Sequence, residues 1–285
     1  MVVESSVSSV VPGGIWGQRL FKTVKYLTFG FLTLNIFLFF GQELESAHHS
    51  LNQGFNLAQA VQLFSATLDT AAWVVLLLLF EVETAIIPDQ YLVGWTKRSI
   101  HGVRLICGAA IVSAWFGYVG EWQVFLGALP APAAACDLVG GDWSVLLDFD
   151  DFVPLSADNC ALLPVDTLQV SGLEQVLAAP AAFASAAELA LVDVINAGAW
   201  ILVVVVLEVE VRQQLRGGIP ERWKGVLGWS KIAIYSTLAL AAIYWGIEGD
   251  FLDFWDAALW LFAFVFIEMN VFDWQFEQRA TEQGI

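Results

Sequence analysis

The chain has 285 residues, of which 58% are hydrophobic and only 14% are charged, and its mean hydropathy is +0.68. An ordinary soluble domain is about 25% charged, so this composition excludes a soluble fold of this size. The 21 Phe and 13 Trp residues exclude a disordered chain, and a net charge of −17 excludes a basic surface for nucleic acid. We therefore expect an all-α membrane protein.

Six apolar segments come close to the roughly 20 residues that a membrane-spanning helix needs. In chain order they are residues 24–41, 70–87, 103–120, 187–207, 226–246 and 255–272. The lipid bilayer is thus the first expected partner. A single polytopic domain of six transmembrane helices is predicted, with residues 121–186 inserted between the third and fourth helices.

The basic residues predict the orientation of this domain in the membrane. Residues 42–69, 121–186 and 247–254 contain no Lys or Arg, so every basic residue falls on one side of the predicted spans. Because cytoplasmic loops carry the excess of Lys and Arg, both termini are expected in the cytoplasm of a cell with this protein in its inner or plasma membrane. The acidic insertion, residues 121–186, is then extracytoplasmic.

This insertion contains two cysteines and a group of aspartates. Cys136 and Cys160 would face an oxidising compartment and could form a disulfide, although their spacing alone does not establish the geometry. Asp148, Asp150 and Asp151 could bind Ca²⁺ through oxygen ligands. They lack the spacing and glycine of an EF-hand, so a solvated acidic loop is the favoured interpretation.

An internal three-fold repeat is the most informative pattern in the sequence. The second, fourth and sixth spans each carry a polar residue, a Trp four positions later, a Glu eight positions after that, and a final polar residue. The three copies are Asp69, Trp73, Glu81 and Glu83; Asn196, Trp200, Glu208 and Glu210; and Asp256, Trp260, Glu268 and Asn270. We expect three repeated helical hairpins, with Asp69, Asn196 and Asp256 near one membrane surface.

The carboxylates at the other end of these spans allow two interpretations. Lys25, Arg104 and Lys231 enter the membrane at a similar depth and could each form an ion pair with one glutamate. Alternatively, Glu81, Glu208 and Glu268 form a ring that binds cations or relays protons, with Glu83, Glu210 and Asn270 beside them. Twelve residues of helix rise about 18 Å, which separates this level from the first polar one.

These features favour a transport protein for cations or protons over an enzyme. The sequence has no nucleophile elbow, zinc-binding helix or phosphate-binding loop, and no cofactor is expected. The alternative is a non-catalytic membrane subunit that scaffolds a larger complex through its acidic insertion, with a protein partner or a second copy of the chain.

Overall fold

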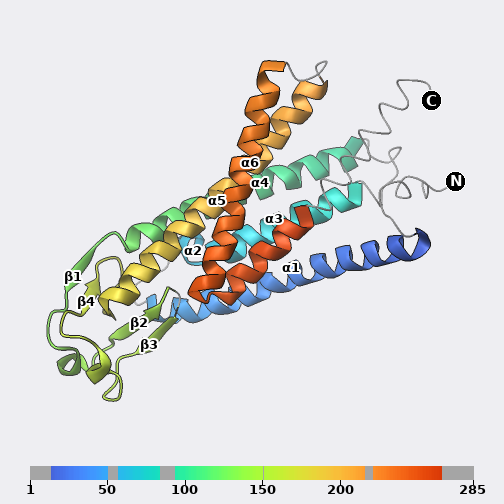
Figure 1. Cartoon of the computed structure of the whole chain (residues 1–285). Helices are drawn as coiled ribbons and strands as arrows, with labels where there is room; N and C mark the ends of the chain where they lie inside the picture. Colours follow the sequence, from blue (N-terminus) through green and yellow to red (C-terminus); the bar gives the residue numbers. More distant parts are fainter. Residues whose placement is uncertain (1–13, 51–56, 84–93, 150, 216–220, 265–285) are drawn as a thin grey trace, which may run out of the picture. The chain divides into compact units, whose positions relative to one another are not determined.

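The computed structural model describes residues 14–50, 57–83, 94–149, 151–215 and 221–264, which are mostly helical (Figure 1). The chain divides into two compact units. One consists of residues 1–35 and 242–285, and the other of residues 36–241. Helices α1 (Gly14–Ser50) and α6 (Glu221–Glu248) each contribute residues to both units.

In the part of the chain that the structure describes, four helices are long and apolar enough to cross a membrane, which confirms the expectation of apolar helices. The segments are Arg19–Ser46 in α1, Gly94–Val124, which is all of α4, Pro180–Glu210 in α5 (Pro180–Leu215), and Trp223–Glu248 in α6. They contain the predicted spans at 24–41, 103–120, 187–207 and 226–246. Since the bilayer core is about 30 Å thick, each helix has residues to spare.

The second and sixth predicted spans are only partly described. Helix α2 (Leu57–Leu63) precedes α3 (Ser65–Glu81), which has 17 residues. Residues 84–87 of the second span lie outside the described residues. Residues 251–264 are helical, and 265–272 of the sixth span again lie outside. The count of six spans and the arrangement of hairpins therefore stay predictions.

The insertion contains a five-stranded sheet, so the expectation of an all-α chain is wrong for this region. The strands are β1 (Ala128–Pro130), β2 (Ser144–Asp148), β3 (Asp151–Pro154), β4 (Leu168–Val170) and β5 (Val176–Ala178). Their order is β1-β4-β5-β2-β3, in which β2 and β5 are parallel and the other pairs are antiparallel. The strands are short, and their pairing is non-local, which a search for long apolar runs does not detect.

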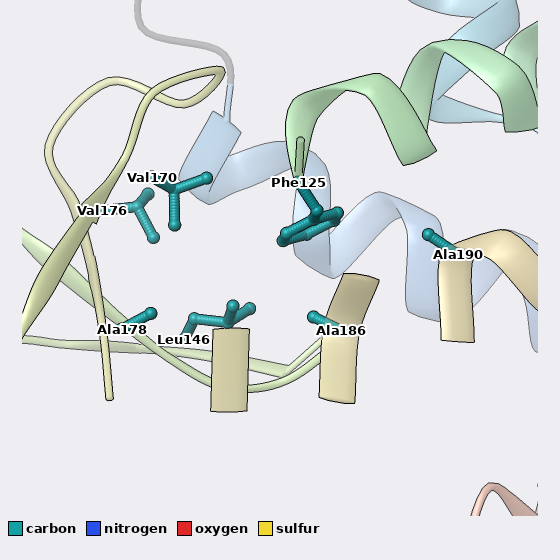
Figure 2. Packing of buried hydrophobic residues seen from close by; sticks show 7 residues of the cluster. All are labelled: Phe125, Leu146, Val170, Val176, Ala178, Ala186 and Ala190. Atoms are coloured by element: carbon teal, nitrogen blue, oxygen red, sulfur yellow. The ribbon is translucent and has the colours of Figure 1, made fainter. Parts of the chain in front are cut away.

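Both faces of the sheet are covered. Along β2, Leu146 packs into one apolar cluster and Val145 into another, as expected for side chains that alternate between the faces of a strand. The first cluster joins the sheet to Phe125, the residue that follows α4, and to Ala186 and Ala190 of α5 (Figure 2). This core attaches the sheet to the ends of α4 and α5.

The second cluster lies beneath a disulfide. Cys136 and Cys160 are bonded, with their Cα atoms 4.9 Å apart, which confirms the pairing that the sequence left open. The two cysteines belong to the short 3-10 helices η3 (Ala135–Leu138) and η4 (Cys160–Leu162). The bridge holds these two helices together over Val145 and Leu177, two of the buried residues in this cluster.

Helices α3, α4 and α5 lie alongside one another in the unit of residues 36–241 (Figure 1). Gly117 of α4 allows a close approach to α2 and α3, because a Cβ atom there would lie 2.8 Å from the Val61 carbonyl oxygen and 2.9 Å from the Ser65 Cβ. We call the end of these helices that joins the sheet the sheet end, and the other the far end.

Candidate functional site

At the sheet end of the helices, four carboxylates act electrostatically on one tyrosine. Tyr118 of α4 is within electrostatic range of Glu43, Asp69, Glu121 and Asp193. These side chains come from four helices, α1, α3, α4 and α5, all within the unit of residues 36–241. We call these five residues the sheet-end carboxylate group. Only Asp69 among them belongs to the polar layer expected from the sequence.

Glu43 has a structural role in this group. The break between α2 and α3 at Phe64 leaves backbone amides at the start of α3 without partners in their own helix. The Glu43 carboxylate accepts hydrogen bonds from the amides of Ala66, at 2.7 Å, and Thr67, at 3.2 Å, and from the Thr67 hydroxyl. A carboxylate from α1 thus caps α3, whose positive N-terminal dipole favours a negative charge.

Asn196, the first polar residue of the second repeat copy, lies on α5 near the sheet-end carboxylate group. Its Oδ1 atom is buried and forms no hydrogen bond within the described part of the chain. Two residues earlier on α5, the Val194 carbonyl oxygen accepts a hydrogen bond of 3.1 Å from the Trp115 indole nitrogen. This contact needs Gly198, because a Cβ atom there would lie 3.2 Å from the indole nitrogen.

An apolar layer separates the sheet-end carboxylate group from the far end. The Trp73 and Trp200 rings, from equivalent positions of the predicted repeat, are 6.3 Å apart. Cys107 and Ile111 of α4 are buried nearby and pack against Trp73 and Ile201. On each helix these residues lie between the polar positions of the two ends.

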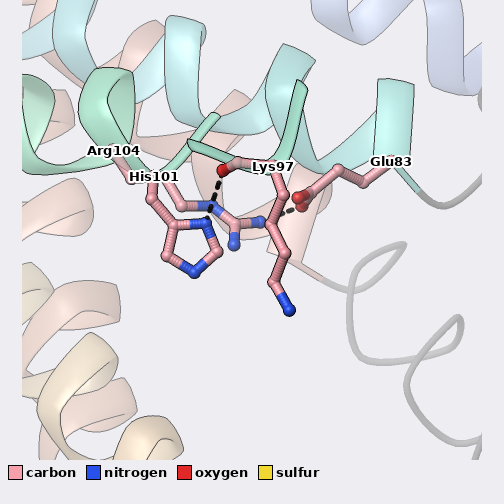
Figure 3. Close-up of polar contacts among 4 residues, drawn as sticks. All are labelled: Glu83, Lys97, His101 and Arg104. Atoms are coloured by element: carbon pink, nitrogen blue, oxygen red, sulfur yellow. Dashed lines mark hydrogen bonds and ion pairs between the residues drawn. The ribbon is translucent and has the colours of Figure 1, made fainter. Parts of the chain in front are cut away.

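Ion pairs occupy the far end. Arg104 pairs with Glu83 (Figure 3), and Lys231 pairs with Glu210 at 2.5 Å. In both pairs the basic residue follows the acidic one by 21 positions, and the two glutamates are equivalent in the predicted repeat. The predicted ion-pair partners Arg104 and Lys231 are thus brought to the second glutamate of each span.

Helix α4 begins beside the first of these pairs. The His101 ring nitrogen Nδ1 and the Lys97 carbonyl oxygen, one turn apart, are 2.9 Å from each other (Figure 3). This local contact and the Glu83–Arg104 pair are separate, so His101 does not join the acidic residues of the far end in the described structure.

The first glutamates of the two described repeats differ in their surroundings. The Glu208 side chain is 55% exposed and pairs with Arg212 one turn later, at 2.5 Å. Glu81 is only 4% exposed, and its Oε2 atom is buried without a hydrogen bond among the described residues. Glu81 also interacts with the described structure through other contacts. Because burying a carboxylate is costly, Glu81 is the unusual member of the predicted ring.

The remaining predicted residues are distributed elsewhere. Lys25 and Asp256 belong to the unit of residues 1–35 and 242–285, where the Lys25 ammonium lies 5.8 Å from the centre of the Phe29 ring. Asp256 accepts a hydrogen bond from Asn35. Glu268 and Asn270 lie outside the described residues, so the three-membered ring is untested.

The aspartates predicted as a weak Ca²⁺ site lie at the β2–β3 turn. Asp148 and Asp151 are paired residues of the two strands, and Asp150 lies outside the described residues. The Asp148 carboxylate accepts a 2.8 Å hydrogen bond from the Phe149 amide. Within the described ranges, no three His, Cys, Asp or Glu residues form a group that could hold a metal ion.

The sequence patterns did not single out several polar residues of these sites. Asp193 and Asn35 each lie inside a predicted span, where a polar side chain is itself a signal of function or pairing. Glu43, Tyr118 and Glu121 lie at the ends of predicted spans, where such residues are common. Only the packing of four helices shows that the carboxylates lie within electrostatic range of Tyr118. Comparisons with known protein families, characterised proteins and solved structures find no match to this chain.

Proposed function

We propose that this chain is an integral membrane transport protein for cations or protons. The observation that carries the proposal is that Glu43, Asp69, Glu121 and Asp193, from four helices, all lie within electrostatic range of Tyr118. Four acidic residues at one end of apolar helices create a negative potential that attracts cations. A packing role alone would be served at lower cost by apolar side chains.

In this proposal, Glu81 is the second ion-binding position of the pathway. It lies about 18 Å along α3 from Asp69, beyond the Trp73–Trp200 layer, and it is buried. The layer must open to pass an ion from one carboxylate level to the other. The ion pairs of Glu83 and Glu210 join neighbouring helices at the far end, Glu208 pairs within α5, and none of the three is part of the pathway.

The full architecture proposed here has six spans in three repeated hairpins. The equal spacing of the Glu83–Arg104 and Glu210–Lys231 pairs and the contact between Trp73 and Trp200 support the repeat. The absence of Lys and Arg from residues 121–186 supports an extracytoplasmic sheet, with both termini in the cytoplasm.

Ion flux into reconstituted vesicles tests the transport function. Vesicles that contain a pH-sensitive dye report protons, and tracer uptake reports Na⁺ or K⁺. The variants Glu81→Gln and Asp193→Asn should each lower flux on the order of tenfold, the equivalent of about 1.4 kcal/mol of lost ion stabilisation. Glu208→Gln is the matched control, because it removes the same charge from an exposed side chain and should leave flux unchanged.

Two results would count against this function. Flux no greater than that of empty vesicles, for protons and for both metal ions, would remove it. Equal losses in all three variants would show that charge in general, and not these positions, matters.

A second candidate is a non-catalytic subunit that scaffolds a complex through its sheet. The favouring observation is the attachment of this acidic sheet to α4 and α5 through the buried cluster around Phe125. Purification in a mild detergent would then recover a partner protein in stoichiometric amount, and the purified chain alone would show no flux.

A further inference from the structure

A polar pair, one buried residue and one half-buried residue, lies within the apolar helices of the smaller unit. The Asn35 amide nitrogen Nδ2 donates a 2.7 Å hydrogen bond to Oδ1 of Asp256, which lies 221 positions later in the sequence. Asn35 is fully buried, with 0% of its surface exposed. It lies within the apolar segment Arg19–Ser46, and Asp256 lies in the helix formed by residues 251–264.

One half of this contact is unsatisfied. The Asn35 oxygen Oδ1 is buried and accepts no hydrogen bond from any described residue. Leaving a buried acceptor without a donor costs about 1–3 kcal/mol. An ionised Asp256 makes this worse, because a carboxylate has only acceptor atoms to offer.

We propose that Asp256 binds a proton at neutral pH and that Asn35 is its partner. The carboxylate takes the proton from water and becomes a carboxylic acid, so the site changes from one negative charge to none. The acid hydroxyl then donates to the Asn35 oxygen, while the Asn35 amide continues to donate to the other Asp256 oxygen. A carboxylic acid and a primary amide satisfy each other through these two hydrogen bonds.

Two opposing effects act on Asp256: hydrogen bonds donated to its carboxyl group favour the carboxylate, and removal from water, the larger effect, favours the acid. The Trp260 indole, one turn along the same helix, also forms a hydrogen bond with the Asp256 side chain. Among the described residues, Asn35 and Trp260 are the side-chain partners of Asp256, and neither carries a charge. The neighbouring Asp250 is engaged elsewhere, since its carboxylate accepts the Asp253 amide at 3.3 Å. On α1, Lys25 precedes Asn35 by ten residues, about 15 Å.

This inference goes beyond the proposed transport function and does not depend on it. Protonation of Asp256 can be measured without flux and in the absence of any partner. If the chain does carry protons, the pair is a place where one is held.

Infrared difference spectroscopy of the full chain in lipid nanodiscs tests the proposal. At pH 7 the native protein should show the carbonyl stretch of a protonated carboxylic acid, shifted to lower frequency in D₂O. Asp256→Asn, which preserves size and shape, should remove this band. Asp250→Asn, on the same segment, should keep it.

A second variant tests the role of Asn35. Asn35→Leu should move the band to higher frequency, because the acid loses its amide partner. Should that variant fail to fold, Asn35→Ser removes the amide with less disturbance and should move the band in the same direction. An identical spectrum for native protein and Asp256→Asn would overturn the protonation, and a band unmoved by the Asn35 variants would overturn the pairing.

Discussion

Gly117 is a position where helix packing in the larger unit tolerates little change. A single methyl group, added by Gly117→Ala, would place its carbon 2.8 Å from the Val61 carbonyl oxygen and 2.9 Å from the Ser65 Cβ. The Gln62 Cα would be 3.3 Å away. The nearest of these is a backbone atom and Ser65 is almost completely buried, so no flexible side chain can move aside. Helix α4 must shift away from α2 and α3.

The size of the effect follows from two opposing terms. Overpacking of a close contact costs about 1–3 kcal/mol. Replacing a mid-helix glycine by alanine gains about 0.5–1 kcal/mol, because the unfolded chain loses freedom. Gly108, in the same helix, has no atom within 4 Å of an added Cβ, so Gly108→Ala measures this gain alone. The difference between the two variants is then the steric cost, about 1–3 kcal/mol.

Unfolding by a denaturing detergent, followed by tryptophan fluorescence, gives the two free energies. Gly117→Ala should unfold at a lower denaturant fraction than the native protein, and Gly108→Ala at an equal or higher one. If the two variants unfold at the same denaturant fraction, α4 does not approach α2 and α3 as closely as the structure shows.

Two further predictions concern the far end and the sheet. Glu83→Gln should lower the unfolding free energy by about 1 kcal/mol, a small loss because the pair with Arg104 is partly exposed and screened. The exchanged pair, Glu83→Arg with Arg104→Glu, should restore this free energy. No recovery would show that the two charges do not interact. Mass analysis without reductant should find Cys136 and Cys160 bonded in protein from its native membrane, and replacing both by Ser should cost the sheet about 3 kcal/mol. Because cytoplasmic thiols stay reduced, free thiols at both positions would also contradict an extracytoplasmic sheet.

The helical, apolar character of the chain could be predicted from composition and run length. A segment of 18 or more apolar residues has no stable arrangement in a membrane other than a helix, because each backbone polar group must be satisfied within the segment. The four long helices accordingly contain predicted spans. The sequence did not predict the sheet, because strands of three to five residues show little periodicity and because β2 pairs with β5, some 30 residues later.

The candidate residues divide in the same manner. The sequence by itself determined which acidic and basic residues lie within or beside apolar segments, since an ionisable side chain within an apolar run is visible in one dimension. Only the tertiary structure decided which of them meet. Helix packing joins Glu83 to Arg104, leaves Glu208 exposed beside Arg212, and buries Glu81. It also brings Asn35 to Asp256 across 221 positions, because a hydrogen bond depends on distance in space and not on position along the chain.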